Sequence, residues 1–237
     1  MRYRVFAALE LADGLRRRLA EVQDGLNLAM SGDGVRWSRP EGVHLTVKFY
    51  GEVDSERLPD LQAGLARAAA EAAPIRVQVQ GLGVFPNPQR PQVIWAGLAG
   101  DLAGLRALQA VVEVEAKTLG FKPEERDYAP HLTLGRVKAG LRPTQHRALI
   151  DYLAEARQWP LGQIEADRLT LLRSELRPGG SVYSVLNLLQ VCVYHCRLAR
   201  QRVYVPFPPL IDTCGIASSD EERPGSVTKI HASGFTV

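Results

Sequence analysis

The sequence is poor in cysteine and has no long apolar run, and both absences narrow the classes of protein that it can encode. Its three cysteines, Cys192, Cys196 and Cys214, all lie beyond residue 190 of 237. An odd count confined to one end argues against a framework of disulfides. No apolar stretch is long enough to span a bilayer, and residues 2–10 alternate like a strand instead of forming the apolar region of a signal peptide. We therefore expect a cytoplasmic protein without a membrane partner.

Cofactor and metal motifs are also missing. The sequence contains no Gly-x-Gly-x-x-Gly fingerprint and no P-loop, so nothing supports a dinucleotide cofactor or ATP. Cys192, His195, Cys196 and Cys214 lack the paired Cys-x-x-Cys spacing of structural zinc sites. The Asp-rich motifs of a two-metal phosphodiesterase are absent as well. We expect no cofactor and no bound metal.

Charge and composition leave the function open. The net charge is +3, from 29 lysines and arginines against 26 acidic residues, and no extended basic block occurs. This balance permits an anionic substrate without requiring one. Hydrophobic residues make up 46% of the chain and charged residues 23%, as in an ordinary globular protein of one large domain or two small ones.

The most informative pattern is a His-x-Thr-x tetrapeptide that occurs twice, 87 residues apart. One copy is His44-Leu45-Thr46-Val47 and the other is His131-Leu132-Thr133-Leu134. Each lies in an apolar, strand-like run, where side chains two residues apart share a face. The histidine and threonine of each copy should therefore point the same way, with the neighbouring apolar residues in the core. Two such strands side by side would form a pocket with two bases and two hydroxyl donors.

The remaining periodicity predicts an α+β fold of two pseudo-symmetric lobes, each a small, mainly antiparallel sheet backed by helices, with the active-site cleft between them. We expect this domain to span residues 1–188 and the chain to be a monomer. Residues 189–237 lack a clear pattern and are polar and rich in Gly and Ser, which indicates a weakly ordered extension. Asp13 is a candidate N-cap of the first helix. The expected strands are 2–10, 35–38, 43–53, 75–80, 93–98, 164–175 and 181–188, and the expected helices are 11–26, 55–73, 101–119 and 143–158.

These segments resemble a known family. Residues 36–53, RWSRPEGVHLTVKFYGEV, are similar to the first motif of the 2H phosphoesterase superfamily, and residues 129–136, APHLTLGR, to the second. The resemblance is to the RNA 2′,3′-cyclic phosphodiesterases, also called 2′-5′ RNA ligases, and extends to residues 83–87 and 174–183. It ends near residue 188, so it implies nothing about the tail.

The resemblance implies hydrolysis of a 2′,3′-cyclic phosphate, at an RNA end or on a nucleotide, to a 2′-phosphomonoester. Histidine, with an ordinary pKa of about 6.5, can act as acid or base near neutral pH. By analogy with the family, His44 protonates the departing 3′-oxygen and His131 activates water. Thr46 and Thr133 then donate hydrogen bonds to the non-bridging oxygens. The same chemistry in reverse would join RNA ends through a 2′-5′ linkage.

Other residues near the motifs are weaker candidates. Arg136 could contact phosphate or ribose, although its strand parity is opposite to that of His131, so a twist or the flexible Gly135 must redirect it. Trp37 could stack on a base. For Lys48 a solvated strand end, and for Phe49 a place in the core, is the expected position.

Two rival functions stay open at this point. A nucleotide- or RNA-binding module could keep the same cleft without turnover, although binding alone does not need two proton-transfer groups. A metal-dependent phosphodiesterase could use the histidines as ligands. Taken one at a time, each histidine could also be a half-buried strand residue that is bonded to a backbone carbonyl.

Overall fold

A single antiparallel sheet organises the molecule. Its nine strands run in the order β7-β4-β5-β6-β3-β1-β8-β9, and β2 pairs with β6 beside this path. The computed structural model describes residues 1–32, 34–177 and 180–191, which belong to a compact unit of residues 1–201. Residues 192–237 lie outside the described residues.

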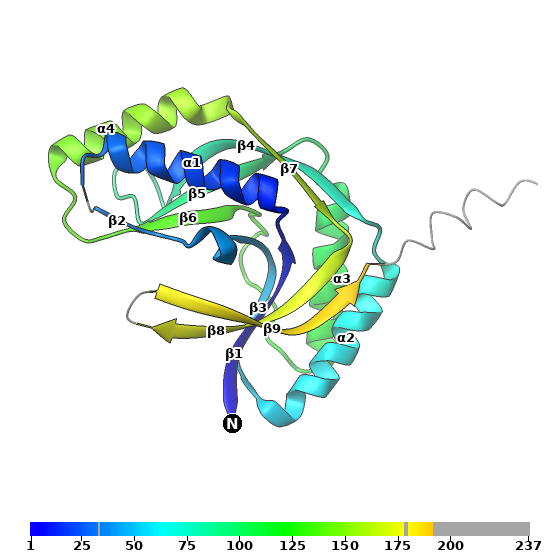
Figure 1. The fold of residues 1–237 in the computed structure, drawn as a ribbon. Helices are drawn as coiled ribbons and strands as arrows, with labels where there is room; N and C mark the ends of the chain where they lie inside the picture. The colour runs from blue at the N-terminus through cyan, green and yellow to red at the C-terminus, as the bar shows by residue number, and fades with distance from the viewer. Residues whose placement is uncertain (33, 178–179, 192–237) are drawn as a thin grey trace, which may run out of the picture. The chain divides into compact units, whose positions relative to one another are not determined.

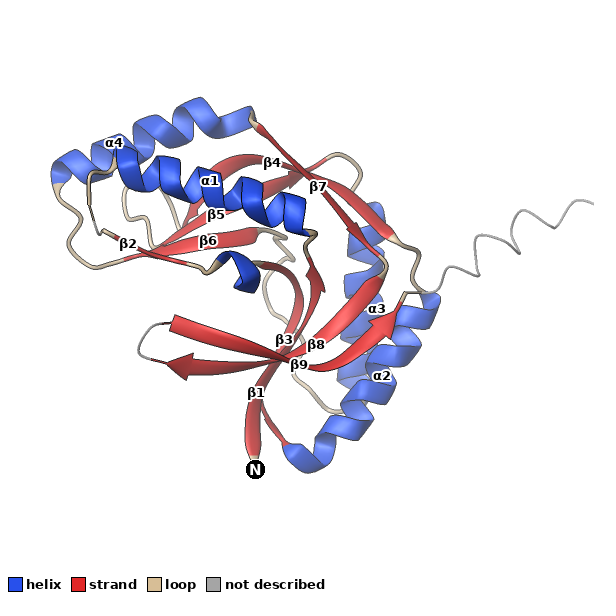
Figure 2. Ribbon diagram, viewed as in Figure 1, coloured by secondary structure: helices blue, strands red, loops and turns tan. Residues whose placement is uncertain are grey.

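The elements follow the expected alternation of strands and helices (Figure 2). The strands are β1 (Arg2–Glu10), β2 (Val35–Trp37), β3 (His44–Asp54), β4 (Ile75–Phe85), β5 (Val93–Ala99), β6 (Leu132–Val137), β7 (Pro160–Ala166), β8 (Arg168–Arg177) and β9 (Gly180–Gln190). The α-helices are α1 (Asp13–Ala29), α2 (Leu58–Glu71), α3 (Ala103–Thr118) and α4 (Pro143–Glu155). Three short 3-10 turns are η1 (Pro40–Gly42), η2 (Ser55–Arg57) and η3 (Ala156–Gln158).

The sheet consists of two groups of strands, each with its own pair of helices (Figure 1). The first lobe contains β3, β1, β8 and β9, with α2 and α3 packed together against it. The second lobe contains β7, β4, β5, β6 and β2, with α1 and α4. The two lobes join where β3 pairs with β6 at a single register position, Leu45 opposite Leu132. The expected lobes are therefore present, but they share one continuous sheet.

The lobes are interleaved in sequence, so neither corresponds to one half of the chain. β1 and β3 of the first lobe come early and β8 and β9 come last, whereas β4 to β7 of the second lobe lie between them. Antiparallel pairing of β1 with both β3 and β8 closes the first lobe around segments more than 100 residues apart. Sequence periodicity cannot reveal that the lobes are interleaved, because it reports only on local structure.

The core lies between the sheet and its helices. In β1, Val5, Ala7 and Leu9 are fully buried and belong to the main hydrophobic cluster. Helix α1 buries Leu15, Leu19, Val22 and Leu26, which recur every three or four residues and so share one face. Each such side chain contributes about 1.5–3 kcal/mol when fully buried. The apolar patterning therefore fixes which face of the sheet carries the helices. The other face of β1 carries a second, smaller hydrophobic cluster of Phe6 and Ala8 with Leu172.

Several expected boundaries were wrong; β4, for example, runs five residues beyond the expected end at residue 80. The strand expected at 164–175 is divided at Asp167 into β7, which pairs with β4, and β8, which pairs with β1 in the other lobe. The N-cap of α1 is Ala12, and Asp13 is the first helical residue. β9 continues to Gln190, and the next residue, Val191, is fully buried and donates its N–H to the Asp167 carbonyl. The expected end at 188 therefore falls inside an ordered strand.

The four α-helices can also be compared with the requirements of a bilayer. Within residues 1–32, 34–177 and 180–191, none combines the length and the apolar character needed to cross one.

Candidate active site

The two His-x-Thr-x motifs meet where the lobes join. His44 is the first residue of β3 and His131 directly precedes β6. Leu45 and Leu132, which pair across the two strands, are fully buried, while the flanking histidines and threonines are only partly buried. Antiparallel pairing at this position sets His44 across from Thr133 and Thr46 across from His131. We call the face that carries these four side chains the histidine face.

Each histidine is oriented by the same hydrogen bond. Nδ1 of His44 lies 2.7 Å from the Gly42 carbonyl oxygen, and Nδ1 of His131 lies 2.8 Å from the Ala129 carbonyl oxygen. A carbonyl can only accept, so Nδ1 carries the hydrogen and Nε2 of the neutral ring is an acceptor. Among the described residues, no hydrogen bond uses Nε2 of either histidine. Both rings therefore have one nitrogen held by the backbone and one available to a ligand.

The threonine hydroxyls are available in the same way. The hydrogen bond that reaches Thr46 comes from the Tyr128 hydroxyl to its backbone carbonyl, at 2.9 Å, and leaves its side chain unused. In the described part of the chain, the buried side-chain polar atoms without a hydrogen-bond partner do not include the hydroxyl oxygen of Thr46 or of Thr133. Both hydroxyls are thus within reach of a ligand on the histidine face.

His44 is electrostatically perturbed. Burial lowers its pKa from 6.5 to about 4, because the imidazolium form loses hydration there. The hydrogen bond to Gly42 partly opposes this change, and the charge of His131 lowers the pKa of His44 further. Ligand-free His44 is therefore neutral at pH 7.

Aromatic rings enclose His44. Phe6, which is fully buried, stacks on the imidazole with ring centroids 4.6 Å apart, and Tyr183 meets it edge-on at 5.0 Å. Phe6 and Tyr183 also contact each other at 5.4 Å. These rings displace water from one side of His44, which accounts for the effect of burial on its pKa.

His131 has a different surrounding. Phe85 meets its imidazole edge-on at 5.0 Å, and Phe85 is also tilted against Trp95 at 5.1 Å. Both Phe85 and Trp95 are only partly buried. Sequence analysis did not select Phe6, Tyr183, Phe85 or Trp95. Only their position in neighbouring strands brings them to the histidines, and that pairing is set by the tertiary fold.

Both motif strands contain an irregularity one residue after the threonine. In β3, Ala8 pairs with Thr46 but Ala7 pairs with Lys48, so Val47 is an extra residue. In β6, Trp95 pairs with Thr133 but Ile94 pairs with Gly135, so Leu134 is an extra residue. A bulge of this kind reverses the alternation of faces beyond it. The residue five positions after each histidine is thereby turned to the histidine face.

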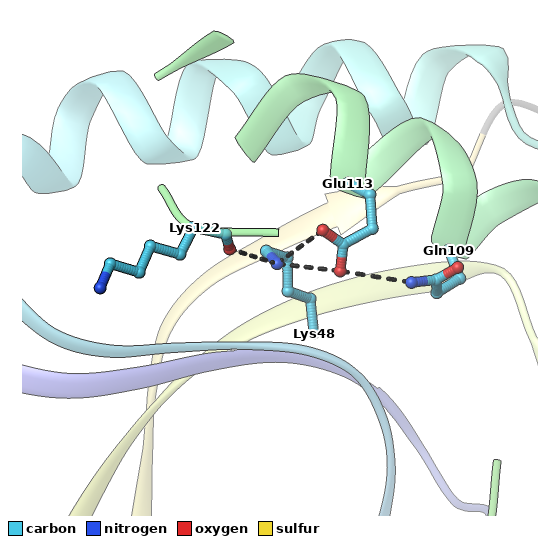
Figure 3. Close-up of polar contacts among 4 residues, drawn as sticks. All are labelled: Lys48, Gln109, Glu113 and Lys122. Carbon is cyan, nitrogen blue, oxygen red and sulfur yellow. Dashed lines mark hydrogen bonds and ion pairs between the residues drawn. The ribbon is translucent and has the colours of Figure 1, made fainter. Parts of the chain in front are cut away.

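The bulge in β3 makes two expectations wrong. Phe49, expected in the core, is 54% exposed and lies 5.3 Å from the Phe6 ring. Lys48, expected in solvent, is buried on the helix side. Its Nζ donates to both carboxylate oxygens of Glu113, at 2.9 and 2.7 Å, and lies 3.4 Å from the Lys122 carbonyl oxygen (Figure 3). Lys48 therefore anchors β3 to α3 and does not reach the histidine face.

The bulge in β6 turns Arg136 in the expected direction. Leu134 and Gly135 are both buried, and Arg136 is exposed on the side of Thr133. Arg36 of β2 lies directly opposite Arg136 and is also exposed. Like charges placed directly across a strand pair repel each other. An anion on this part of the surface would relieve that repulsion.

The structure does not bring Trp37 together with the histidines. Trp37 lies opposite Gly135, which belongs to the helix side of β6, and it packs against the main hydrophobic cluster. Its indole Nε1 donates to the Asn27 side chain on α1, at 3.2 Å. The expectation that Trp37 lines the substrate site is therefore at odds with its position, because β2 turns this side chain toward α1.

The described residues contain no group of three or more His, Cys, Asp or Glu side chains that could hold a metal ion. The Cys and His residues considered in the tail, from Cys192 to Cys214, lie outside the described residues. A cavity of about 410 Å³ is lined by residues of β3, by Arg57 of η2 and by the segment after α3, including Phe121.

Comparison with known proteins gives a consistent result. The family model described as LigT like Phosphoesterase matches residues 9–95 and 99–183. The RNA 2′,3′-cyclic phosphodiesterase of Methanothermobacter thermautotrophicus is 33% identical over 191 residues, which cover 81% of this chain and all of the relative. The protein of the same name from Aeropyrum pernix is 34% identical over 71% of this chain and 92% of its own length.

Solved structures share the fold. TT0787 of Thermus thermophilus superposes with a TM-score of 0.67 at 29% identity, over 79% of this chain and 97% of that one. E. coli LigT complexed with 3′-AMP gives a TM-score of 0.63 at 20% identity, over 81% and 99% of the two chains. The second likeness is evidence of a common fold alone.

Proposed function

The chain belongs to the LigT-like phosphoesterase family, and we propose that it hydrolyses RNA or nucleotide 2′,3′-cyclic phosphates to 2′-phosphomonoesters with His44 and His131 as the proton-transfer pair. The observation that carries this proposal is the matched orientation of the two rings. Each is held through Nδ1 by the carbonyl two residues before it, and each leaves Nε2 to the same face. A binding module would not need two such groups.

The reaction follows from this geometry. Water attacks phosphorus from one side and gives its proton to Nε2 of one histidine, while the bond to the 3′-oxygen breaks on the other side. That oxygen takes a proton from Nε2–H of the second histidine, which leaves a free 3′-hydroxyl and a 2′-phosphate. Each proton transfer typically contributes roughly 10²–10⁴-fold in rate. Thr46 and Thr133 donate to the non-bridging oxygens, where negative charge develops. The chain's own residues thus supply every step.

The acid role of His44 needs help from the substrate. The resemblance assigns His44 as the acid, yet burial holds its pKa at about 4 in the ligand-free protein. A phosphate anion beside Nε2 favours the imidazolium form and so raises the pKa. We therefore expect the protein to take up about one proton on binding a 2′-nucleotide near pH 6. Calorimetric titration in buffers of different ionisation enthalpy measures this uptake, and a binding heat that is independent of buffer would contradict the assignment.

Arg136 and Arg36 are the proposed phosphate contacts outside the reacting group. They face each other across β2 and β6 on the histidine face, and the bulge at Leu134 directs Arg136 there. Guanidinium groups match phosphate oxygens in shape and charge. The reverse reaction, joining a 5′-hydroxyl RNA end to the cyclic phosphate, uses the same groups. We expect hydrolysis to outpace it with dilute RNA because water is in large excess.

Hydrolysis of a nucleoside 2′,3′-cyclic phosphate in excess chelator tests the proposal. Wild-type protein should give a 2′-phosphomonoester, identified by phosphorus NMR, and His44→Gln and His131→Gln should each lose roughly 10²–10⁴-fold in kcat. His146→Gln is the matched control, because this histidine is bonded to the Pro88 carbonyl at 2.8 Å and takes no part in the scheme. Loss of wild-type activity in chelator, or a 3′-phosphate product, would overturn the proposal.

A further inference from the structure

One of the three tryptophans differs from the other two in its surroundings. All three lie in the described part of the chain, and Trp37 and Trp159 pack against the main hydrophobic cluster. Trp95 does not belong to that cluster or to its packed margin. A large aromatic side chain normally contributes to folding by burying its area in the core. Trp95, which is only partly buried, does so to a lesser extent.

The position of Trp95 is next to the catalytic groups. On β5 it pairs with Thr133 of β6 on one side and with Gly83 of β4 on the other. Directly opposed residues in an antiparallel pair share a face, so Trp95 lies on the histidine face beside the Thr133 hydroxyl. Phe85 contacts both the Trp95 ring and the His131 ring, with centroids 5.1 and 5.0 Å away.

Two glycines make room for the indole. A Cβ placed on Gly83 would lie 2.3 Å from one indole carbon, and a Cβ on Gly97 would lie 3.2 Å from another. The ring therefore rests against backbone at two positions where any side chain would lift it. Its Nε1 is buried and has no hydrogen-bond partner among the described residues, whereas Nε1 of Trp37 is bonded to Asn27. Ring packing, and no polar contact, sets the orientation of Trp95.

We propose that Trp95 is the platform on which a nucleobase of the RNA end stacks while the cyclic phosphate is held between the histidines. This inference rests on the proposed function and names the residue that binds the base. Every base has a π face, so stacking of this kind tolerates all four bases and contributes binding without reading sequence. The role expected of Trp37 from sequence thus passes to Trp95.

Paired substrates separate base binding from chemistry. One is a nucleoside 2′,3′-cyclic phosphate or a dinucleotide that ends in one, and the other is 1-O-methylribose 2,3-cyclic phosphate, which has no base. Trp95→Leu should raise KM for the base-bearing substrates by roughly 5- to 150-fold, as measured for loss of base–aromatic stacking, and leave KM for the base-free substrate unchanged. kcat should change little in both cases. Trp95→Phe should recover part of the loss, and Trp159→Leu is the matched control.

Gly83→Ala tests the placement of the ring without removing it. The added methyl group meets the indole directly, so the variant should raise KM for base-bearing substrates while the base-free substrate is processed as before. Phe49→Leu removes the more exposed ring of the histidine face. If Phe49→Leu abolished the preference for a base and Trp95→Leu did not, the platform would be Phe49 and the proposal would be wrong.

Fluorescence provides an independent readout that does not depend on turnover. A protein with Trp95 as its single tryptophan, made by Trp37→Phe and Trp159→Phe, should be quenched by a 2′-nucleotide and not by ribose 2-phosphate. A protein that keeps only Trp37 should not respond. If wild type hydrolyses neither cyclic phosphate, the proposed function fails. If it hydrolyses both and Trp95→Leu leaves every KM unchanged, only the platform fails.

Discussion

The two halves of the site start from the same four-residue motif and end in different surroundings. His44 lies against the fully buried Phe6 and the edge of Tyr183, and burial lowers its pKa to about 4. His131 contacts a partly exposed Phe85, which also contacts Trp95. Local sequence repeats the same backbone hydrogen bond at both rings, whereas the neighbouring strands determine how each is solvated. The chemistry is thus nearly symmetric, while binding and electrostatics are not.

The two halves of the site should differ most in how much the phenylalanine beside each histidine contributes to the stability of the fold. Phe6→Ala should lower the free energy of unfolding by about 3–5 kcal/mol, because a fully buried ring leaves a cavity. Phe85→Ala should cost clearly less, since its ring is partly exposed. Urea denaturation of both variants measures the two values. Equal losses would mean that the two rings are equally buried in solution, contrary to the structure.

The two strands also differ in the residue that directly follows the extra residue of each bulge. β3 places Lys48 on the helix side, paired with Glu113, where β6 has Gly135. Lys48→Met should cost roughly 3 kcal/mol of unfolding free energy, because it leaves a partly buried carboxylate unpaired. Adding Glu113→Leu should recover most of that loss. If Lys48→Met alone were as stable as wild type, the pair of Lys48 and Glu113 would not anchor β3.

Acid should destabilise the protein through His44. The unfolded chain takes up a proton near pH 6.5 and the folded chain only near pH 4, so stability is lost as pH falls between these values. The full loss is about 3 kcal/mol for the shift from 6.5 to about 4. Chemical denaturation of wild type and His44→Gln at several pH values isolates the contribution of His44 to the pH dependence of the unfolding free energy. If His44→Gln lost as much unfolding free energy as wild type between pH 6.5 and pH 4, His44 would not be the source of the acid sensitivity.

Arg136 and Phe49 occupy equivalent places five residues after the two histidines, and replacing each compares a charge with a ring. Arg136→Met should raise KM roughly tenfold and weaken its dependence on salt, since a charged hydrogen bond is worth about 1.5 kcal/mol or more. Phe49→Leu should leave the salt dependence unchanged. Steady-state kinetics between low and moderate ionic strength distinguish them, and identical salt slopes in wild type and Arg136→Met would exclude a phosphate contact.

Sequence alone could predict the motif strands but not their surroundings. Alternation placed Leu45 and Leu132 in the core with the histidines and threonines on the opposite face, because side-chain parity in a strand is a local property. The same parity was wrong for Phe49 and Lys48, since a bulge is set by pairing with a neighbouring strand. Trp37 and Trp95 illustrate the limit. Both are strand tryptophans, and only the register with Gly135, Gly83 and Thr133 shows which one shares a face with the histidines.

Single-turnover hydrolysis of a nucleoside 2′,3′-cyclic phosphate by wild type, His44→Gln, His131→Gln and the double variant tests the two-histidine mechanism most directly. Groups that act as a unit are strongly non-additive, so each single variant should lose roughly 10²–10⁴-fold and the double variant no more than about tenfold beyond the worse single one. Losses that multiply, or full activity in either single variant, would contradict the account.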